Sequence, residues 1–143
     1  MRIEFTVAGS PHGKGRPQFS TYGGRVHTRT PEKTVIYENL VKVEYQRQCG
    51  KSRFADDAML EVEIYAYYDI PQSASNKKKQ AMRDGTLRPK KKPDADNVIK
   101  TICDSLNKIA YHDDAQVVDV VLHKYYSDEP RTRVIIAELE ENK

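Results

Sequence analysis

Hydrophobic and polar residues alternate along several stretches of the chain, which is the pattern of β-strands with one buried face. The two clearest stretches are residues 3–7 and 60–68. Residues 116–126 and 131–139 are rich in β-branched and aromatic side chains. A short turn-forming segment separates these last two, so we predict that they form an antiparallel hairpin. A smaller hairpin is predicted over residues 19–27, around two adjacent glycines.

Three other stretches are predicted to be helices, and the first and third of them repeat hydrophobic residues at helical spacing. The first begins at Thr30-Pro31, a favourable N-cap and first helical position, and closes at Gly50. The second is a short basic helix over residues 73–85. The third opens at Asp94, and its inward-facing residues are Val98, Ile102, Ser105 and Ile109. This order predicts an α+β fold, in which residues 1–143 form a single compact domain with a mixed or antiparallel sheet and about three helices.

Composition argues against a membrane-spanning helix. The mean hydropathy is −0.77, 31% of the residues are charged, and there is no run of 18 apolar residues. The first residues are too polar for a signal peptide. Cys49 and Cys103 form neither a CxxC pair nor a disulfide framework. We therefore expect a cytoplasmic protein with free thiols.

Positive charge is concentrated in one short stretch. Residues 77–92 contain a single acid and eight basic residues, which are Lys77, Lys78, Lys79, Arg83, Arg88, Lys90, Lys91 and Lys92. This stretch has a net charge of +7, whereas the whole chain has +3, so the rest of the protein is net negative. Segregated positive charge is typical of a surface that binds nucleic-acid phosphates. The glycine-rich loop with Lys14 and Arg16 is a second candidate contact. Solvated lysines on a surface helix are the alternative interpretation.

Acidic residues follow the basic stretch directly. Asp94 and Asp96 lie where an extended lead, fixed by Pro93, becomes a helix, so their carboxylates can converge. Lys100 follows Asp96 by four residues and shares its helix face. A further pair, Asp113-Asp114, comes after the helix. Carboxylate oxygens are suited to hard divalent cations. Ordinary helix capping by Asp94 and an ordinary Asp96–Lys100 ion pair are the alternative.

The sequence around these acids resembles the RusA-type Holliday junction resolvases, a family common in phages and prophages. The resemblance rests on residues 92–100, then 104–107, 113–114 and 116–117. It extends outward to the loop 13–17, to Thr30-Pro31, and to Lys124 with Pro130-Arg131. It therefore covers nearly the whole chain. The combination is far more specific than a lone Asp-x-Asp.

The resemblance implies a RusA-like fold and a crossover junction endodeoxyribonuclease that nicks four-way DNA junctions symmetrically in recombination and repair. Its implied cofactor is Mg²⁺, with Mn²⁺ as a possible substitute, and its implied assembly is a homodimer. The family's essential acids fall on Asp94, Asp96 and Asp114, and its essential lysine on Lys100. Asp113 is an adjacent acid, and either Asp113 or Asp114 could be the third metal ligand.

Chain reach limits how Asp114 can join the other two acids. A helix from Asp96 to about Asn107 is ~17 Å long, and the seven residues 108–114 span at most ~23 Å. Asp114 can therefore reach the acids of its own chain only if the segment doubles straight back along the helix. We expect this route. The alternative is that a partner chain supplies Asp114.

Two other functions use the same residues. One is a flap or single-strand nuclease, and the other is a non-catalytic DNA-binding protein whose acids only cap a helix. His112 could be a ligand or base, but we expect a loop histidine. Several tyrosines could stack on unpaired bases, although strand tyrosines generally pack in the fold, and no role is assigned to them: Tyr22, Tyr65, Tyr67, Tyr125 and Tyr126.

Overall fold

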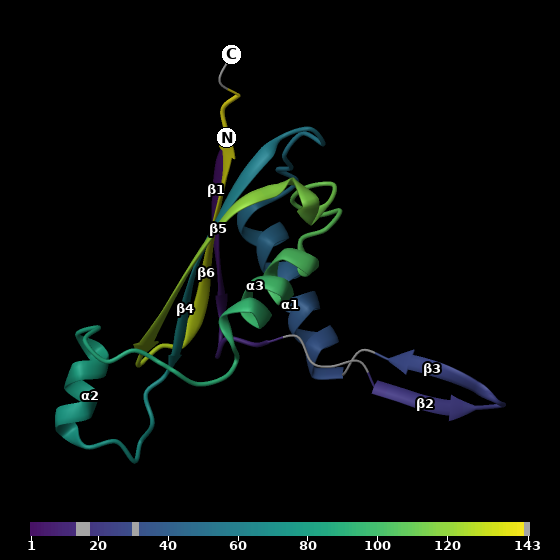
Figure 1. The fold of residues 1–143 in the computed structure, drawn as a ribbon. Coiled ribbons are helices and arrows are strands. Elements are labelled where there is room, and N and C mark those ends of the chain that lie inside the picture. Colours follow the sequence, from purple (N-terminus) through teal and green to yellow (C-terminus); the bar gives the residue numbers. More distant parts are fainter. Residues whose placement is uncertain (14–17, 30–31, 142–143) are drawn as a thin grey trace.

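The computed structural model describes residues 1–13, 18–29 and 32–141. They form a four-stranded sheet with helices on one side and a separate two-stranded arm (Figure 1). This architecture confirms the predicted α+β class, the mixed sheet and the three helices. The elements in chain order are β1 (Arg2–Ala8), β2 (Gln18–Tyr22), β3 (Arg25–Arg29), α1 (Glu32–Cys49), β4 (Met59–Asp69), α2 (Asn76–Arg83), α3 (Ala95–Ser105), the 3₁₀ turn η1 (Asp114–Gln116), β5 (Val117–Ser127) and β6 (Arg131–Leu139).

The predicted hairpin between residues 116–126 and 131–139 is wrong. The strand order is β1-β6-β4-β5, so β4 lies between the two strands that were expected to pair. β5 runs parallel to β4, whereas β6 is antiparallel to both β4 and β1. The chain leaves β4, passes through α2 and α3 and returns as β5. A crossover of this length gives parallel pairing.

Burial explains which strand takes the central position. Val134, Ile135 and Ile136 of β6 are all buried, so both faces of this strand are covered. In β5, by contrast, Val118, Val120 and Val121 are exposed. A strand with apolar side chains on both faces is stabilised most inside the sheet, where strands flank both of its edges and neighbouring side chains cover both of its faces. β5 is therefore left at the edge.

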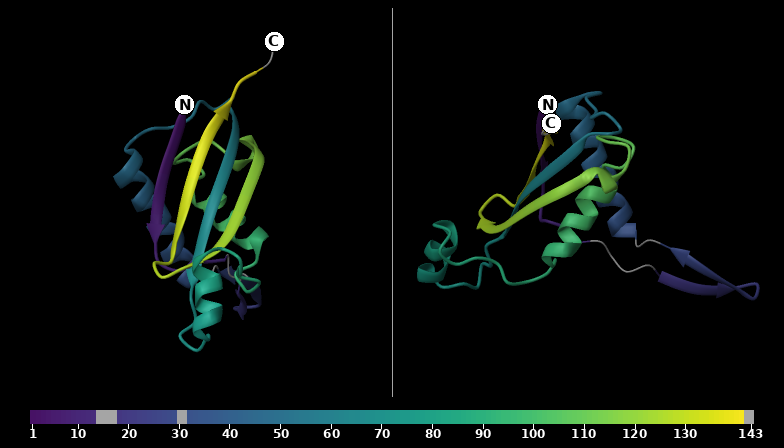
Figure 2. Two further views of the ribbon diagram at one scale, coloured as in Figure 1. Left: turned by 90° about the vertical axis from the view of Figure 1, so that its left-hand side faces the viewer. Right: turned by 45° about the horizontal axis from the view of Figure 1, so that its top comes forward.

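Helices α1 and α3 cover one face of the sheet, and no helix of the described residues covers the opposite face (Figures 1 and 2). Alternation along β4 sends Val62, Ile64 and Ala66 toward the helices, where they are fully buried. The same core receives large side chains from the other elements: Phe5, Val7, Tyr37, Val41, Tyr45, Val98, Ile102, Leu106 and Tyr111. This layer fixes α3, which carries the acidic residues, against the sheet.

Strands β2 and β3 form the predicted small hairpin, which extends away from the sheet (Figure 1). Its turn places Gly23 at φ 58° and Gly24 at φ 74°. Two consecutive residues with positive φ are the requirement of a tight hairpin turn that glycine meets at no steric cost. Two sequence predictions fall outside the described residues. They are the DNA contact by Lys14 and Arg16 and the helix start at Thr30-Pro31.

Two helices are shorter than predicted. α2 begins after Ser75, whose side chain accepts a hydrogen bond from the Lys78 backbone N–H. α3 ends at Ser105, so Ile109 packs against the core from the following turn rather than from the helix. Within the described ranges, no helix combines the length and apolar character needed to cross a membrane.

The strand order can be tested with two matched substitutions. We expect Val134→Ala, on β6, to lower the free energy of unfolding by about 2 kcal/mol, because it removes two buried methyl groups. Val121→Ala, on the exposed edge strand, makes the same chemical change and should cost less than about 1 kcal/mol. Chemical denaturation followed by circular dichroism measures both. Equal losses for the two variants would contradict the placement of β6 at the centre.

Candidate functional site

The segment that leads into α3 is fastened to the sheet by two side chains. The Tyr68 hydroxyl of β4 donates a hydrogen bond to the Pro93 carbonyl oxygen at 2.6 Å. The Lys124 ammonium of β5 donates to the Lys91 carbonyl oxygen at 2.8 Å and lies 4.8 Å from the centre of the Tyr68 ring. Burial lowers the pKa of Lys124, and the charge of Asp94 partly offsets this effect. These contacts set the position of Asp94, and sequence reasoning missed the role of both residues.

Asp94 occupies the N-cap position of α3, but its carboxylate makes no capping hydrogen bond. Its backbone carbonyl accepts the first helical bond, from the Val98 N–H at 3.0 Å. Asp96 lies in the first helical turn and Lys100 one turn later, and both are exposed. In this structure no salt bridge joins the described side chains of Asp96 and Lys100. The capping and ion-pair alternative therefore does not account for these three charged groups.

After α3 the chain reverses sharply. Lys108 adopts φ 68°, and its N–H donates to the Tyr111 carbonyl oxygen at 2.8 Å. The buried Tyr111 hydroxyl donates to the Cys103 carbonyl oxygen at 2.6 Å, and this ties the returning chain to the helix. The Asp114 N–H then donates to the Asn107 side-chain oxygen at 2.8 Å. The chain thus doubles back along α3, as the reach argument required for a site built within one chain.

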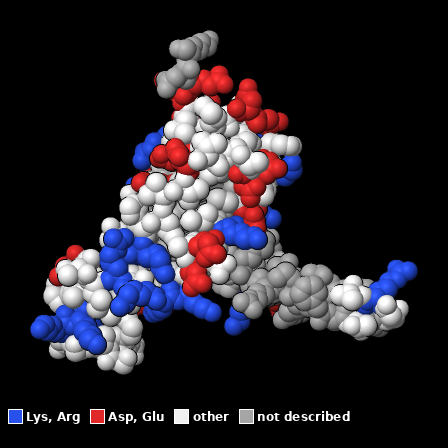
Figure 3. Space-filling view, in the orientation of Figure 1, with Lys and Arg blue, Asp and Glu red and all other residues white. Residues whose placement is uncertain are grey.

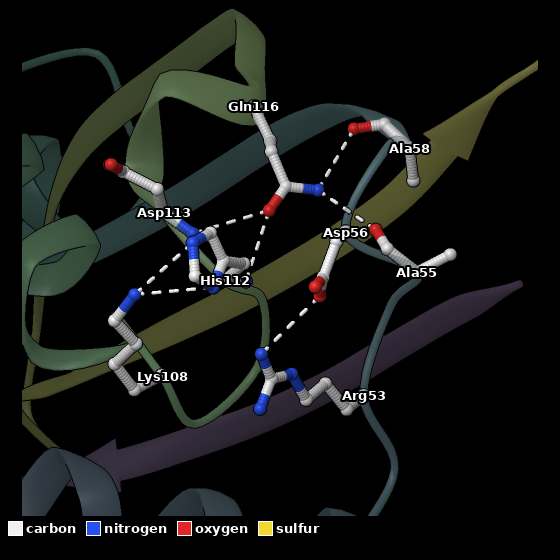
Figure 4. Close-up of polar contacts among 8 residues, drawn as sticks. All are labelled: Arg53, Ala55, Asp56, Ala58, Lys108, His112, Asp113 and Gln116. Atoms are coloured by element: carbon white, nitrogen blue, oxygen red, sulfur yellow. Dashed lines mark hydrogen bonds and ion pairs between the residues drawn. The ribbon is translucent and has the colours of Figure 1, made fainter.

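The two adjacent acids, Asp113 and Asp114, have different structural roles. The Asp113 carboxylate caps η1 by accepting from the Ala115 N–H at 3.1 Å. The Gln116 amide completes this capping box, because its oxygen accepts from the His112 and Asp113 N–H groups while its nitrogen reaches the carbonyls of residues 55 and 58 (Figure 4). The His112 ring contacts the Lys108 ammonium. Gln116 therefore anchors the acidic loop to the chain before β4.

Asp114 lies beside a second carboxylate, Asp104 of α3. Burial, hydrogen bonding to Asp113 and Asp104, and the negative charge of both neighbours raise the pKa of Asp114 to about 6. In contrast, the hydrogen bond from Ala115 lowers the pKa of Asp113. Sequence reasoning missed Asp104 at this position. Its spacing was a usable signal, since Asp96, Lys100 and Asp104 recur every four residues along one helix face.

The four predicted catalytic residues, Asp94, Asp96, Lys100 and Asp114, line two surface cavities. The larger, of about 510 Å³, lies between α3 and β5 and is lined by charged and apolar side chains: Asp96, Ile99, Lys100, Cys103, Asp104, Asp114, Val117 and Val120. The other, of about 410 Å³, is lined by Pro11, His12, Gly13, Lys92, Pro93, Asp94 and Asn97. Asp96, Lys100 and Asp114 thus share one cavity, and Asp94 lines the second.

Gly13 allows the N-terminal loop to approach the start of α3 closely. A Cβ atom at this position would lie 2.8 Å from the Pro93 Cβ and 3.1 Å from the Asn97 Cβ. Both contacts are closer than real Cβ atoms comfortably allow, so a side chain here would push the loop away. The glycine therefore brings the loop of residues 11–13 against the cavity that Asp94 lines.

The donors at the site are carboxylate oxygens, which suit Mg²⁺ or Mn²⁺ rather than softer metals. Burial is the largest cause of the raised pKa of Asp114, and the neighbouring carboxylates of Asp113 and Asp104 raise it further. A divalent cation bound beside Asp114 would favour its charged form. Among the described residues, no three acid, histidine or cysteine side chains already form a closed cluster around one point. That Asp94, Asp96 and Asp114, with or without Asp113, bind metal remains a prediction.

The basic stretch forms a cationic surface at the end of the sheet next to these cavities. Figure 3 shows Lys and Arg side chains over α2 and beside it, close to acidic side chains near the start of α3. Two of the arginines also support the fold. Arg83 forms an ion pair with Asp128 at 2.9 Å, and Arg88 donates to the Lys124 carbonyl oxygen and stacks 4.1 Å from the centre of the Tyr125 ring. The lysines at 77, 78, 90, 91 and 92 are exposed.

The aromatic side chains of the sheet lie on the other side. Tyr65 and Tyr67 alternate with the core residues of β4, so they point to the face without helices. Tyr65 stacks on His123 at 4.9 Å, and Tyr67 stacks on Tyr125 at 6.0 Å and on the Arg131 guanidinium at 4.0 Å. These rings contact one another and arginines, away from the acidic residues of α3. No role in the site is assigned to them.

A small α+β domain that sets carboxylates and a lysine beside a cationic surface has the composition of a phosphodiester-cleaving nuclease. The family model described as "Endodeoxyribonuclease RusA" matches residues 8–137 of this chain. The chain therefore belongs to the RusA endodeoxyribonuclease family. It is also similar to the "Uncharacterized protein YqaN" of Bacillus subtilis (strain 168), with 40% identity over 139 residues and 96% coverage of both chains.

The raised pKa of Asp114 predicts a specific pH dependence of stability. Its pKa is about 6 in the folded protein against an ordinary 3.8, so the folded state holds a proton that the unfolded chain releases. The resulting stabilisation is complete below about pH 3.8 and is lost as the pH rises through about 6. We expect Asp114→Asn to make stability fall less between these values, as measured by urea denaturation without divalent ions.

Asp128→Asn is the control for this measurement. Its ion pair with Arg83 lowers the pKa of Asp128, so its stabilisation is present above pH 3.8 and is lost as the pH falls. The substitution should therefore change the pH profile in the opposite sense. A profile that Asp114→Asn leaves unaltered between pH 4 and 6 would contradict the raised pKa.

The Tyr68 hydroxyl can be tested with a matched pair of variants. Tyr68→Phe and Tyr45→Phe each remove one hydrogen bond from a buried tyrosine to a backbone carbonyl. Each should therefore lower stability by about 1 kcal/mol. Of these two tyrosines, only Tyr68 contacts the segment before Asp94, so only Tyr68→Phe should reduce DNA cleavage, by about tenfold or more. Thermal unfolding and single-turnover cleavage measure the two effects, and equal activity of both variants would count against this positioning role.

Proposed function

We propose that this protein is a Mg²⁺-dependent nuclease that cuts four-way DNA junctions by paired, symmetrical nicks. The observation that carries the proposal is the cavity between α3 and β5. There Asp96, Lys100 and Asp114 of a single chain line one hollow, although Asp114 lies eighteen residues after Asp96. Membership of the RusA endodeoxyribonuclease family supports DNA as the substrate.

The carboxylates would hold the cation. Asp96 and Asp114 face the shared cavity, and Asp94, whose carboxylate has no capping bond, lies at the start of the same helix. Asp104 adds a further oxygen donor next to Asp114. When bound, a divalent cation supplies Lewis acidity for hydrolysis of the phosphodiester. Mg²⁺ is the expected ion because it needs few protein carboxylates, and Mn²⁺ would be a substitute.

Lys100 is placed to act on the phosphate itself. Its side chain is exposed, lines the same cavity and forms no salt bridge with Asp96. The ammonium group can therefore donate hydrogen bonds to a phosphate oxygen and stabilise the negative charge that develops there. A lysine whose charge was already neutralised by a neighbouring carboxylate could not do this as effectively.

The cationic surface of residues 77–92 would bind the DNA arms. Five exposed lysines on α2 and the following segment supply charge without a fixed geometry, which suits contacts to the phosphate backbone. The segment that carries Lys91 and Lys92 also continues directly into Asp94. DNA held by these lysines therefore passes next to the carboxylates, and the loop containing Lys14 and Arg16 is proposed as an additional contact.

Symmetrical nicking needs two equivalent sites, and a homodimer with twofold symmetry provides them. Each chain contributes a complete set of candidate residues, because the chain reversal after α3 brings Asp114 back to the helix of its own chain. The proposed dimer therefore does not need to exchange catalytic residues. Its purpose is to present two sites to two equivalent strands of the junction.

The decisive experiment compares the wild-type protein with Asp96→Asn on a synthetic four-way junction. We expect Asp96→Asn to reduce Mg²⁺-dependent cleavage by at least about 10³-fold, because it removes a charged oxygen ligand and keeps the side-chain shape. Junction binding without metal should change less than about threefold, since the phosphate contacts come from the lysines. Asp57→Asn, at an exposed acid before β4, is the control and should leave both unchanged.

The substrate and product pattern separates the proposal from its alternatives. Mapped nicks at symmetrical positions on the four-way junction, with weaker cutting of Y-forks and flaps, are the expected result. Preferred cutting of flaps would indicate a different branched-DNA nuclease. Binding without cleavage in either Mg²⁺ or Mn²⁺ would indicate a non-catalytic DNA-binding protein.

A further inference from the structure

Another cavity, of about 510 Å³, lies where helix α1 ends and the chain reverses after α3. Three bases, an amide, a glycine and an apolar side chain line it: Lys51, Arg53, Lys108, Gln46, Gly50 and Ile109. None of these lining residues is acidic. A hollow lined by three positive groups is suited to an anion. This hollow, the basic cavity, shares no residue with the basic stretch 77–92 or with the two cavities that the carboxylates line.

Hydrogen bonds between its segments hold the basic cavity in shape. The Tyr45 hydroxyl of α1 donates to the Ser52 carbonyl oxygen, which fixes the turn of residues 51–53 against the helix. The Phe54 N–H donates to the Ala110 carbonyl oxygen at 2.9 Å and joins this turn to the reversal after α3. The basic residues of the two segments are therefore held together, although they lie far apart in the sequence.

Lys108 has a backbone conformation that favours glycine. Its φ is 68°, and among the described residues every other positive φ belongs to a glycine. A residue with a Cβ atom is strained in this region, whereas glycine is not. The ammonium group of Lys108 lines the cavity and contacts the His112 ring. Backbone strain of this kind is concentrated at functional positions, so it points to a use for the charge.

The basic cavity adjoins the carboxylates at the end of α3. Asn107, which precedes Lys108, accepts a hydrogen bond from the Asp114 N–H at 2.8 Å. Figure 4 shows the Lys108 and Arg53 side chains beside the loop that carries the acids. The basic stretch 77–92, by contrast, leads into the start of α3. Carboxylates of the candidate site therefore lie between two cationic regions, one at each end of the helix.

The basic residues also have an ordinary structural explanation. Bases near the ends of α1 and α3 complement the helix dipoles, each of which contributes about half a negative charge at its end. Arg53 forms an ion pair with Asp56 at 3.4 Å, but the pair is long and exposed, and such pairs are weak. The three bases of the cavity exceed this negative charge. A positive surplus is left to attract an anion.

We propose that the basic cavity binds a phosphate of the DNA backbone, so that one DNA arm is held at both ends of α3. The inference rests on the proposed function, because its ligand is the same DNA. α3 has 11 residues and is about 16 Å long. One base-pair step along a duplex is about 3.4 Å, so the helix spans about five steps. An arm that lies along α3 meets the basic stretch at one end and the basic cavity at the other, and the carboxylates face the phosphates between them.

Two matched substitutions test the basic cavity without nuclease activity. Arg53→Gln removes one charge from the cavity, whereas Arg2→Gln removes one from an exposed base of β1, on the face without helices. We expect Arg53→Gln to weaken binding of a synthetic four-way junction in EDTA by about three- to tenfold. The plot of log affinity against log salt should become shallower by about one. Arg2→Gln should change affinity less than about twofold. Fluorescence anisotropy over a salt series measures both quantities.

Lys108→Gly separates DNA binding from folding. The substitution removes the ammonium group and also the backbone strain at φ 68°. We therefore expect the melting temperature to stay the same or rise, while junction affinity falls by at least about threefold. A lower melting temperature with unchanged affinity would assign this lysine to the fold alone and overturn the proposal.

A neutral phosphate analogue identifies the contact on the DNA. Single methylphosphonates are placed at successive positions along one arm of the junction. At one or more positions the wild-type protein should lose about threefold or more in affinity, while Arg53→Gln loses less than about twofold, because the variant already lacks that contact. Equal losses for both proteins at every position contradict the proposal.

Binding and cleavage together separate failure of this inference from failure of the proposed function. Weaker junction binding by Arg53→Gln, with no cleavage by the wild-type protein, supports the basic cavity and contradicts only the nuclease. Cleavage by the wild-type protein, with unchanged affinity and salt dependence in Arg53→Gln, contradicts only the basic cavity.

Discussion

Helix α3 is held at both of its ends by a tyrosine hydroxyl that donates to a backbone carbonyl, and the candidate site depends on these two bonds. At the first end Tyr68 fixes Pro93, the residue before Asp94. At the other end Tyr111 fixes Cys103, and the chain that carries Tyr111 continues to Asp114. Both tyrosines are buried, so breaking either bond leaves a polar group without a partner away from water. The helix therefore serves as a rigid support for charged groups on its exposed face.

Groups of both signs lie near this support. Burial raises the pKa of Asp114, and the neighbouring carboxylates of Asp113 and Asp104 raise it further, while the lysines at 77, 78, 90, 91 and 92 are exposed. Lys124 and Tyr68 hold the backbone that joins the basic stretch to Asp94 in place, through the carbonyl oxygens of Lys91 and Pro93. An arrangement that keeps both signs available is suited to binding a cation and a polyanion side by side.

The core between the sheet and the helices fixes α3, because Val98, Ile102 and Leu106 pack into it. α3 also contacts both α1 and β5. The charged groups on its exposed side therefore keep a fixed relation to the returning chain, in which the Asp114 N–H donates to the Asn107 side chain.

Much of this could be read from the sequence. Alternation gave the strands at residues 3–7 and 60–68, and Asp94, Asp96, Lys100 and the basic stretch all stood out, because short-range spacing decides which residues share a helix face. Local spacing cannot decide which strands become neighbours. The order β1-β6-β4-β5, the position of Asp104 beside Asp114 and the contacts of Lys124 with Lys91 depend on how buried surface is shared among distant segments. Only the tertiary structure decides which strands become neighbours, because the apolar surface that one strand can bury depends on where all the other strands lie.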